Sequence, residues 1–525
     1  MIADDCAAGQ SLQSGPGVFA RRRRQSPDPF PMTNSVRRAL LLLFCSAAAT
    51  PLAAQVAQRE YAARRDSVAA AMPDGVLLAL GGQEPAEDFL SFYPRPAFLY
   101  LTGVTEPEAV LVIAKHDGAA ATTIFVQPRD PGREAWTGTR LGASGTTRAT
   151  GMPARTIDQL QPALDSLLER GGTLSVVGDI GGETYLTHDD QLVASLERAH
   201  PGITTADASG LVDRLRMRHS GAELALERKA IDITARAQRE AIATIRAGMN
   251  EFEIQALIEY TFRRNGADRP SFSTIVGSGP NSTALHYNAD DRFMRAGDVV
   301  VMDIGASYRG YAADVTRTVP VSGTFTPDQR AIYQIVRNAQ RAAEEVAHVG
   351  VSQATLDAAA NRALTDGLTR LGLIDSANAV YDPGSGGCRR RIARGCAQLS
   401  LYYIHALGHG IGLEVHDPTS RVITPGNAFT IEPGIYVRPT MLDELPDTPR
   451  NRPLIARLRP LVKRYANIGV RIEDDYFVTP AGVEWISRAP READEIEQMM
   501  RSRAATPAPR DSAVVDWYRQ TEPPR

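Results

Sequence analysis

The chain has 525 residues, of which 23% are charged, and its formal net charge is −3 at pH 7. This length gives room for two or three ordinary domains with a large core. Because the charge is nearly balanced, no extended basic surface is predicted, and nucleic acid is not expected as a partner.

Residues 32–54 have the pattern of a segment that is removed when a protein is exported. Residues 1–31 are expected to be disordered or to precede a true start at Met32. From Met32, a charged start, a short apolar stretch and small residues before Gln55 predict a signal peptide over 32–54, with an amphipathic or buried helix as the alternative. This pattern predicts an exported protein, periplasmic or secreted. Because the apolar stretch is short, no stable membrane span is expected after processing.

Residues 58–210 are predicted to form an N-terminal α/β domain. Short apolar runs indicate strands, and the amphipathic pattern over 157–172 indicates a helix that ends at Gly171. The runs interpreted as strands are 75–80, 97–104, 109–114, 122–126 and 174–179. This region contains no cluster of metal-binding residue types, so its sequence predicts no metal chemistry of its own.

Residues 211–490 are predicted to form a second domain. Amphipathic patterns predict helices over 220–248 and 250–266, and two further helices that begin after Thr326 and Ser352. Capping-box residues at the starts of the second and third of these helices support the assignment. Because strand-like pairs lie between and after the helices, the region predicts an α+β fold with a largely antiparallel sheet.

Three stretches are predicted to lack regular structure. Residues 381–398 and 438–464 are rich in proline, glycine or arginine and are interpreted as loop insertions. Residues 491–525 are interpreted as a polar, frayed C-terminal tail. The first insertion contains Cys388 and Cys396, which could form a disulfide in an oxidising compartment or remain free thiols.

Two aspartates lie inside apolar, strand-like runs. If Tyr308 and Arg309 form a two-residue turn, Asp303 and Asp314 stand directly opposite each other, with Cβ atoms about 4.5–5.5 Å apart. Like charges in this position repel, so a positive group is expected between them, either an arginine or a pair of divalent cations. A pair of solvent-facing acids is the alternative, but apolar residues flank both aspartates.

Histidines and glutamates further along the chain could complete a metal site. His405, His409 and His416 lie in a glycine-rich segment. The first two have the spacing of a zinc-binding helix, but alanine replaces the glutamate of that motif and the glycines argue against a helix. Glu432 and Glu473 each lie beside an apolar run, where an acid is costly unless it is paired or coordinated. Mostly oxygen ligands favour Mn²⁺, Co²⁺ or Zn²⁺.

The stretches LHYN, MDIGA, YAADVTRT, GHGIGLEVHD, IEPGIY and RIEDD resemble the motifs of the pita-bread (creatinase/aminopeptidase-like) metallopeptidases. The resemblance spans 211–490 and is strongest to the Xaa-Pro aminopeptidases (aminopeptidase P). The upstream stretches FLYLTGVTEPEAVLVI and AWTGTRLG resemble the N-terminal domain of that family. The resemblance therefore implies a C-terminal pita-bread domain that follows an N-terminal α/β domain.

The resemblance implies a site with two divalent metal ions, usually Mn²⁺, with Co²⁺ or Zn²⁺ as alternatives. Asp303 would bind one metal, Asp314 and Glu473 would bridge the two, and His409 and Glu432 would complete the shell of the other. These five residues are the expected metal ligands.

The resemblance also implies residues that handle the substrate. His286, His405, His416 and Arg471 match such positions, and Glu432 is the expected proton acceptor and donor. The implied activity removes the N-terminal residue from peptides with proline in second place, by a hydroxide that bridges the two metals. A dipeptide-specific prolidase and a non-catalytic, peptide-binding pita-bread protein are the alternatives, and a homo-oligomer is expected.

Overall fold

The computed structural model describes residues 56–502, except 88, 170, 183–184, 385–386, 389 and 393–394. The expected disordered start and signal peptide lie outside the described residues, and so does the part of the expected tail after 502. No helix in the described part combines the length and hydrophobicity needed to cross a membrane.

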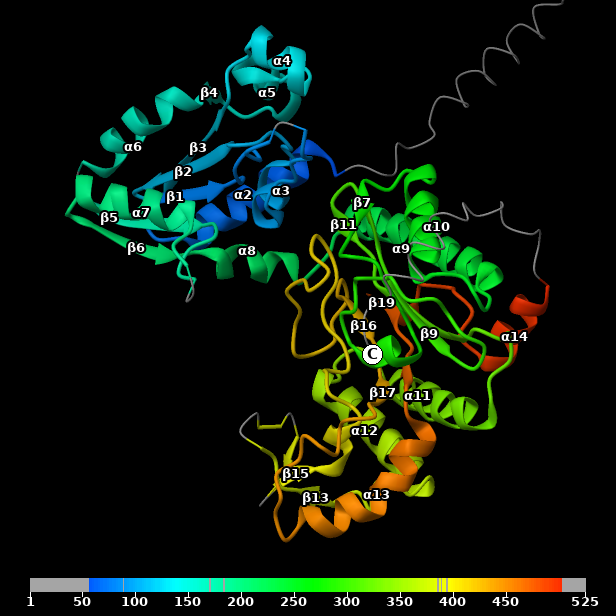
Figure 1. Cartoon of the computed structure of the whole chain (residues 1–525). Helices are drawn as coiled ribbons and strands as arrows, with labels where there is room; N and C mark the ends of the chain where they lie inside the picture. Colours follow the sequence, from blue (N-terminus) through cyan, green and yellow to red (C-terminus); the bar gives the residue numbers. More distant parts are fainter. Residues whose placement is uncertain are drawn as a thin grey trace, which may run out of the picture. The chain divides into compact units, whose positions relative to one another are not determined.

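The N-terminal domain is built on a six-stranded mixed sheet with the strand order β4-β3-β2-β1-β5-β6 (Figure 1). The strands are β1 (Gly75–Leu80), β2 (Val110–His116), β3 (Ala119–Val126), β4 (Ala154–Thr156), β5 (Gly172–Val177) and β6 (Ile203–Asp207). The helices are α2 (Gln58–Ala71), α3 (Pro96–Thr102), α4 (Pro131–Thr137), α5 (Gly142–Thr150), α6 (Leu160–Leu168), α7 (His188–Ala199) and α8 (Ser209–Arg216). Four of the five predicted strands are confirmed as β1, β2, β3 and β5.

The fifth predicted strand, 97–104, is wrong, because these residues form helix α3. Pro96 stands at the start of the helix, where its missing N–H costs nothing. Gly103 ends the helix in the left-handed conformation, with φ of 67°. Residues of α3 such as Phe98 and Leu101 are buried, and a short, fully apolar run of this kind does not distinguish a buried helix from a strand.

The C-terminal domain contains five small sheets, and every strand pair in them is antiparallel. The strands are β7 (Arg269–Pro270), β8 (Ile275–Ser278), β9 (Val299–Ile304), β10 (Ala306–Tyr308), β11 (Tyr311–Ala312), β12 (Val315–Pro320), β13 (Val380–Tyr381), β14 (Arg391–Ile392), β15 (Gly395–Ala397), β16 (Ala428–Ile431), β17 (Gly434–Val437), β18 (Ile468–Arg471), β19 (Asp474–Thr479) and β20 (Gly482–Trp485). The helices are α9 (Gly221–Thr244), α10 (Glu251–Arg264), α11 (Pro327–Val346), α12 (Gln353–Arg370), α13 (Asn451–Tyr465) and α14 (Ala493–Arg501).

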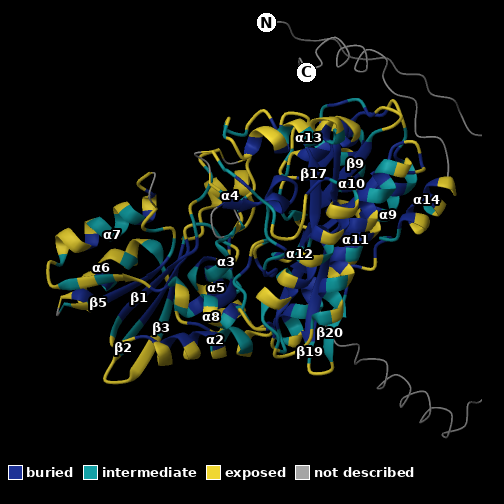
Figure 2. Cartoon of the chain, turned by 90° about the horizontal axis from the view of Figure 1, so that it is seen from below, coloured by how far each residue is buried: buried dark blue, intermediate teal, exposed yellow. Residues whose placement is uncertain are grey.

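Helices α9 and α11 are tied to the strands by buried amides. Gln238 of α9 donates to the carbonyl oxygens of Met302 and Val315, at 3.0 and 2.7 Å. Gln340 of α11 donates to Asp474 at 2.9 Å. Figure 2 shows β9 and β17 buried, whereas α9 and α11 carry both buried and exposed faces. The predicted helices are confirmed here, and the capping boxes that begin α10 and α11 are formed.

The stretch 438–464, interpreted as a loop insertion, contains most of helix α13, so that interpretation is wrong for 451–464. Leu454, Leu458 and Val462 are spaced four residues apart and bury one face of the helix. The many arginines and Pro460 hide this spacing in the sequence. The other predicted insertion, 381–398, contains the short strands β14 and β15 and the Cys388–Cys396 disulfide.

The prediction of a frayed tail directly after residue 490 is also wrong, because helix α14 follows at 493–501. Ile496 and Met500 are buried against the main core. Glu497 accepts a hydrogen bond from the backbone N–H of Phe325 at 3.0 Å. It also forms an ion pair with Arg330 at 2.5 Å. A helix of this length is held by tertiary contacts rather than by its own propensity, which is why its composition did not reveal it.

Replacing Ile496 by alanine tests whether α14 is part of the core. Ile496 is fully buried, so Ile496→Ala is expected to lower the free energy of unfolding by about 2–5 kcal/mol. Gln498 is exposed on the same helix, and Gln498→Ala is the control, with an expected change below about 0.5 kcal/mol. Urea denaturation followed by circular dichroism measures both. An equally small effect of the two substitutions would contradict the packing of α14.

Candidate metal centre

The hairpin that carries Asp303 and Asp314 turns one residue later than predicted. Arg309 and Gly310 form the turn, with φ of 51° and 86°, and glycine adopts this left-handed conformation easily. Asp303 therefore pairs with Thr316 and not with Asp314. Since side chains alternate along a strand, a register shift of two residues keeps both acids on one face, where burial and the charge of Asp303 raise the pKa of Asp314.

The predicted metal ligands converge around the imidazole of His409. Its Nε2 atom lies 3.6 Å from Asp314 Oδ2, 3.5 Å from Glu432 Oε1 and 3.6 Å from Glu473 Oε1. Ligand atoms of Asp314, His409 and Glu473 all lie within 4.8 Å of one another. Asp303 adds its negative charge to this cluster, since, besides burial and Glu473, it raises the pKa of Asp314 and of Glu432. The five predicted ligands therefore act on one another although they are spread over 171 residues of sequence.

Backbone pairing fixes His409 and Glu432 relative to each other. Thr430 of β16 donates its N–H to His409 O at 2.9 Å, and Glu432 donates to Leu407 O at 2.7 Å. A Cβ at Gly408 would overlap the carbonyl of Thr430, so only glycine allows this close approach. The segment is thus held in extended contact with β16 and contains no helix, as the glycines predicted.

A second set of contacts fixes Glu473 against the strand β12. Glu473 donates its N–H to Thr316 O at 3.1 Å, and the hydroxyl of Thr316 donates to Glu473 Oε2 at 2.8 Å. The hydroxyl of Thr318 accepts from the N–H of Arg471 at 3.1 Å. Thr316 was not identified from the sequence, because its role depends on the pairing of strands that are far apart in the chain.

Three oxygens of this cluster are buried and lack a hydrogen-bond donor in the described part of the chain: Asp303 Oδ1, Asp314 Oδ1 and Glu473 Oε1. Buried carboxylate oxygens are costly unless they are hydrogen-bonded, paired or bound to a cation. Four carboxylates and one imidazole form a donor set that suits divalent metal ions. The residues present therefore fit the metal ions that the sequence predicted.

The pKa shifts show an excess of negative charge. Burial, followed by repulsion from Glu473, raises the pKa of Asp314 and of Glu432 well above their ordinary values. Burial opposes ionisation of Asp303, but the Arg471 guanidinium lowers the pKa of that carboxyl. Although burial also disfavours a charged His409, its contact with Glu473 and the charge of Glu432 raise its pKa to about 9. The carboxylates thus attract protons strongly, and metal cations would compete for the same charge.

The predicted substrate-handling residues lie around this cluster. Arg471 forms an ion pair with Asp303 and donates to Tyr436 Oη at 2.9 Å. His405 Nε2 also lies 2.8 Å from Tyr436 Oη, and its Nδ1 lies 3.4 Å from Glu432. Tyr436 was missed from the sequence, although it ends the IEPGIY stretch. It links His405 to Arg471 on the side of the cluster that Glu432 occupies.

His416 and His286 lie on another side of the cluster. The ring centroid of His416 is 4.3 Å from that of His409, and burial lowers the pKa of His416, followed by the charge of His409. His286 is exposed, and its charge also acts on His416. The carbonyl of Leu285, the residue before it, accepts from Arg471 at 3.2 Å. His286 is therefore the outermost member of the predicted set.

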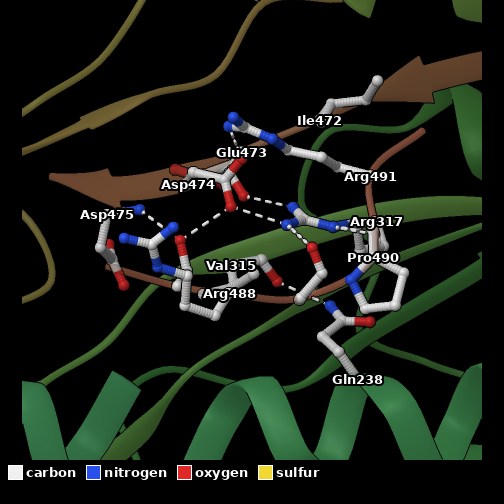
Figure 3. A network of polar contacts seen from close by, with 12 residues as sticks. Gln238, Val315, Arg317, Ile472, Glu473, Asp474, Asp475, Arg488, Pro490 and Arg491 are labelled. Carbon is white, nitrogen blue, oxygen red and sulfur yellow. Dashed lines mark hydrogen bonds and ion pairs between the residues drawn. The ribbon is translucent and has the colours of Figure 1, made fainter. Parts of the chain in front are cut away.

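A buried polar network lies behind Glu473 (Figure 3). Arg317 is fully buried and forms an ion pair with Asp474 at 2.6 Å. It also donates to the carbonyl oxygens of Glu473 at 2.7 Å and Pro490 at 2.6 Å. Asp474 in turn accepts from Arg491 at 3.1 Å. Because Arg317 holds both the carbonyl of Glu473 and the side chain of Asp474, this network restrains the backbone that carries the Glu473 carboxylate.

Comparisons with known proteins agree with this geometry. Residues 61–176 match the model of the aminopeptidase P N-terminal domain, and residues 225–480 match that of metallopeptidase family M24. The chain is 33% identical over 467 residues to the Xaa-Pro aminopeptidase of Escherichia coli K12, covering 85% of this chain and 98% of that protein. The chain belongs to metallopeptidase family M24. Its C-terminal domain is accordingly the pita-bread domain of this family, which acts with divalent metals.

Other M24 relatives support the same assignment. The human Xaa-Pro dipeptidase is 28% identical over 497 residues, covering 87% of this chain and 95% of that protein. The structure of proline aminopeptidase P II from Yersinia pestis has a TM-score of 0.71 at 29% identity, covering 85% and 100%. E. coli aminopeptidase P with the inhibitor Pro-Leu also has a TM-score of 0.71 at 29% identity, covering 86% and 99%.

Breaking the Arg317–Asp474 pair on one side only tests the network behind Glu473. Arg317→Met leaves the buried Asp474 carboxylate with Arg491 as its remaining cationic partner, and is expected to lower the free energy of unfolding by about 1.5–3 kcal/mol. The double variant Arg317→Met/Asp474→Leu removes both charges and is expected to be less destabilised than the single one. Urea denaturation with a chelator present measures this without a contribution from bound metal. A double variant that loses the sum of both single effects would contradict the pairing.

Proposed function

We propose that this M24 protein is a metal-dependent aminopeptidase that removes the N-terminal residue from peptides with proline in second place. The observation that carries the proposal is the convergence of the five predicted ligands, with three of their oxygens buried and without a donor in the described part. Its support from the comparisons is the 33% identity to an Xaa-Pro aminopeptidase over nearly that protein's whole length.

The chemistry divides between the metal site and the residues around it. Asp303, Asp314, His409, Glu432 and Glu473 would hold two divalent ions, which when bound would activate water and polarise the scissile carbonyl. Glu432 is suited to take up a proton and hand it on, because burial and nearby acids raise its pKa. His405, 3.4 Å from Glu432, is placed to orient that carboxyl group.

His416, beside His409, and Arg471, paired with Asp303, would each interact with charge at the cluster. Burial and the charge of His409 lower the pKa of His416, and this imidazole could donate a hydrogen bond to an oxyanion. Arg471 holds Asp303 ionised, and so keeps that carboxylate ready as a ligand. Manganese is the metal we propose, supported by the oxygen-rich donor set, with Co²⁺ or Zn²⁺ as alternatives.

Two related activities are separated by simple observations. A prolidase would cleave Xaa-Pro dipeptides alone, and the similarity to the human dipeptidase keeps this as the second candidate. A non-catalytic peptide-binding role is disfavoured because all five ligand types are present. Tripeptides of the form Xaa-Pro-Xaa distinguish the first two activities, since a strict dipeptidase leaves them intact.

We also propose that the protein is exported and forms a homo-oligomer. The Cys388–Cys396 disulfide supports export, since such bonds persist in oxidising compartments. Phe89 and Trp136, which are 78% and 79% exposed, support the oligomer, because apolar side chains of this size gain from being covered.

Activity and metal dependence are tested together with synthetic peptides. The protein with Mn²⁺ is expected to release the first residue of Xaa-Pro-Xaa but not of Xaa-Ala-Xaa, and a chelator should abolish the release. Asp314→Asn is expected to lower kcat/KM at least about 100-fold, because it removes a ligand rather than an outer contact. Asp366→Asn, at an exposed position of α12, is the control and should retain activity. Full activity of metal-free protein would contradict the proposal.

Export is tested by the sequence and mass of the mature protein. Expression of the whole chain in a Gram-negative host is expected to give a periplasmic protein that begins at Gln55. Alkylation without reductant should label no cysteine, because Cys6 and Cys45 are removed and Cys388 and Cys396 are paired. A protein that keeps Met32 or Met1 in the cytoplasm would contradict export, whereas labelled thiols in an otherwise mature protein would contradict only the disulfide.

A further inference from the structure

A large cavity lies between α3 of the N-terminal domain and the β10–β11 hairpin of the pita-bread domain. Its volume is about 860 Å³, within the range of about 300–1,000 Å³ that is typical of ligand sites. Both domains belong to one compact unit of the chain, Ala54–Arg525. The described residues that line the cavity include none of the nine predicted site residues, so the metal centre does not account for it.

The lining of the cavity has an excess of positive charge. Arg95, Lys229, Arg269 and Arg309 line it, against a single carboxylate. Arg95 is neutralised by an ion pair with Asp189 of α7. The other three cations form no ion pair with a carboxylate anywhere in the described residues.

The single carboxylate of the lining belongs to Asp268 and is already engaged. It accepts a hydrogen bond from the N–H of Gly310 at 3.0 Å, which holds it to the hairpin turn. The cavity therefore favours a ligand that carries negative charge.

Arg269 is the cation best placed to receive such a ligand. Its guanidinium carbon lies 3.9 Å from the ring centroid of Tyr93, which holds the flat group by a cation–π contact. Its backbone is fixed by the pairing of β7 with Ser307 of β10. A guanidinium held by its face keeps its edge free, and two parallel N–H groups on that edge match a carboxylate.

A smaller cavity of about 290 Å³ leads from this site toward the metal centre. It shares Arg269, Leu413 and three further lining residues with the large cavity, and His416 lines its other part. The ring of His416 is 4.3 Å from the ring of the predicted ligand His409. The two cavities thus share lining residues, and the smaller one reaches His416, beside the predicted metal ligand His409.

We propose that the large cavity binds the part of the substrate that lies downstream of the scissile bond, and that Arg269 favours peptides with a carboxylate there. This inference rests on the proposed aminopeptidase function and adds a preference for anionic peptides to it. The carboxylate comes either from the peptide C-terminus or from an acidic side chain, and both sources present the same group to the guanidinium.

The test uses the Mn²⁺-loaded whole protein and two peptide series. One series lengthens Xaa-Pro-Ala by one alanine at a time, each peptide as free acid and as amide. The other keeps the amide and places one Asp at successive downstream positions. For the peptides whose carboxylate reaches the cavity, Arg269→Ala is expected to lower kcat/KM about tenfold, mainly through KM, because the lost contact is a charged hydrogen bond. The shortest amide should be unaffected.

Two further variants and one binding measurement complete the design. Arg269→Lys should retain part of the preference, since it keeps the charge without the paired N–H groups. Arg236→Ala, at an exposed arginine of α9 outside the cavity, is the matched control. Calorimetry with the product peptides, which begin with proline, compares acid and amide forms without turnover.

The outcomes separate the two proposals. Failure to cleave any Xaa-Pro peptide would overturn the proposed function, and calorimetry would still decide the role of the cavity. Equal use of acids, amides and Asp peptides by the wild-type protein would overturn the cavity proposal. An equal loss on every substrate, including the shortest amide, would do the same. A preference seen only with free acids, or only with Asp peptides, identifies the source of the carboxylate.

Discussion

The mutual repulsion of buried carboxylates is the constraint on which the rest of this structure depends. Asp314, Glu432 and Glu473 meet around the imidazole of His409, and the charge of Asp303 acts on two of them. Three of the four carboxylates have a buried oxygen that lacks a donor within the described chain. Such a cluster opposes folding unless cations offset it. Arg471 supplies one positive charge from the protein. The negative charge that the protein leaves unbalanced makes the cluster a strong site for divalent metals. The same repulsion therefore opposes folding without metal and favours metal binding.

The surrounding structure holds these acids in place by hydrogen bonds and by close approach of the backbone. Thr316 binds both the backbone and the side chain of Glu473, and Gly408 lets the His409 segment approach β16. Arg317 grips the carbonyl of Glu473 from behind. A metal site needs its ligands to be held in the coordination geometry before the metal binds. These contacts supply that rigidity, and substitutions of Thr316, Gly408 or Arg317 would act on metal binding without changing a predicted ligand.

The sequence predicted the centre of the site better than its surroundings. Acids in apolar strands are conspicuous in any sequence, so Asp303 and Glu473 could be found from the residues themselves. The hairpin register was wrong by two residues, yet the error preserved the face, because side chains alternate with a period of two. Arg317 and Tyr436 could not be found, since their partners become neighbours only when strands from distant parts of the chain pair. The helices α3, α13 and α14 were missed for a related reason, since burial rather than local composition stabilises them.

The buried guanidinium of Arg317 also has a consequence for how the protein is made. It binds Asp474 and the carbonyl of Pro490, which follow it by 157 and 173 residues. Neither partner exists while the ribosome is still translating the middle of the chain. While the domain is incomplete, Arg317 and the acids of the cluster therefore lack the partners that surround them in the folded protein. The buried network behind Glu473 can therefore be completed only after residues up to Pro490 have been synthesised.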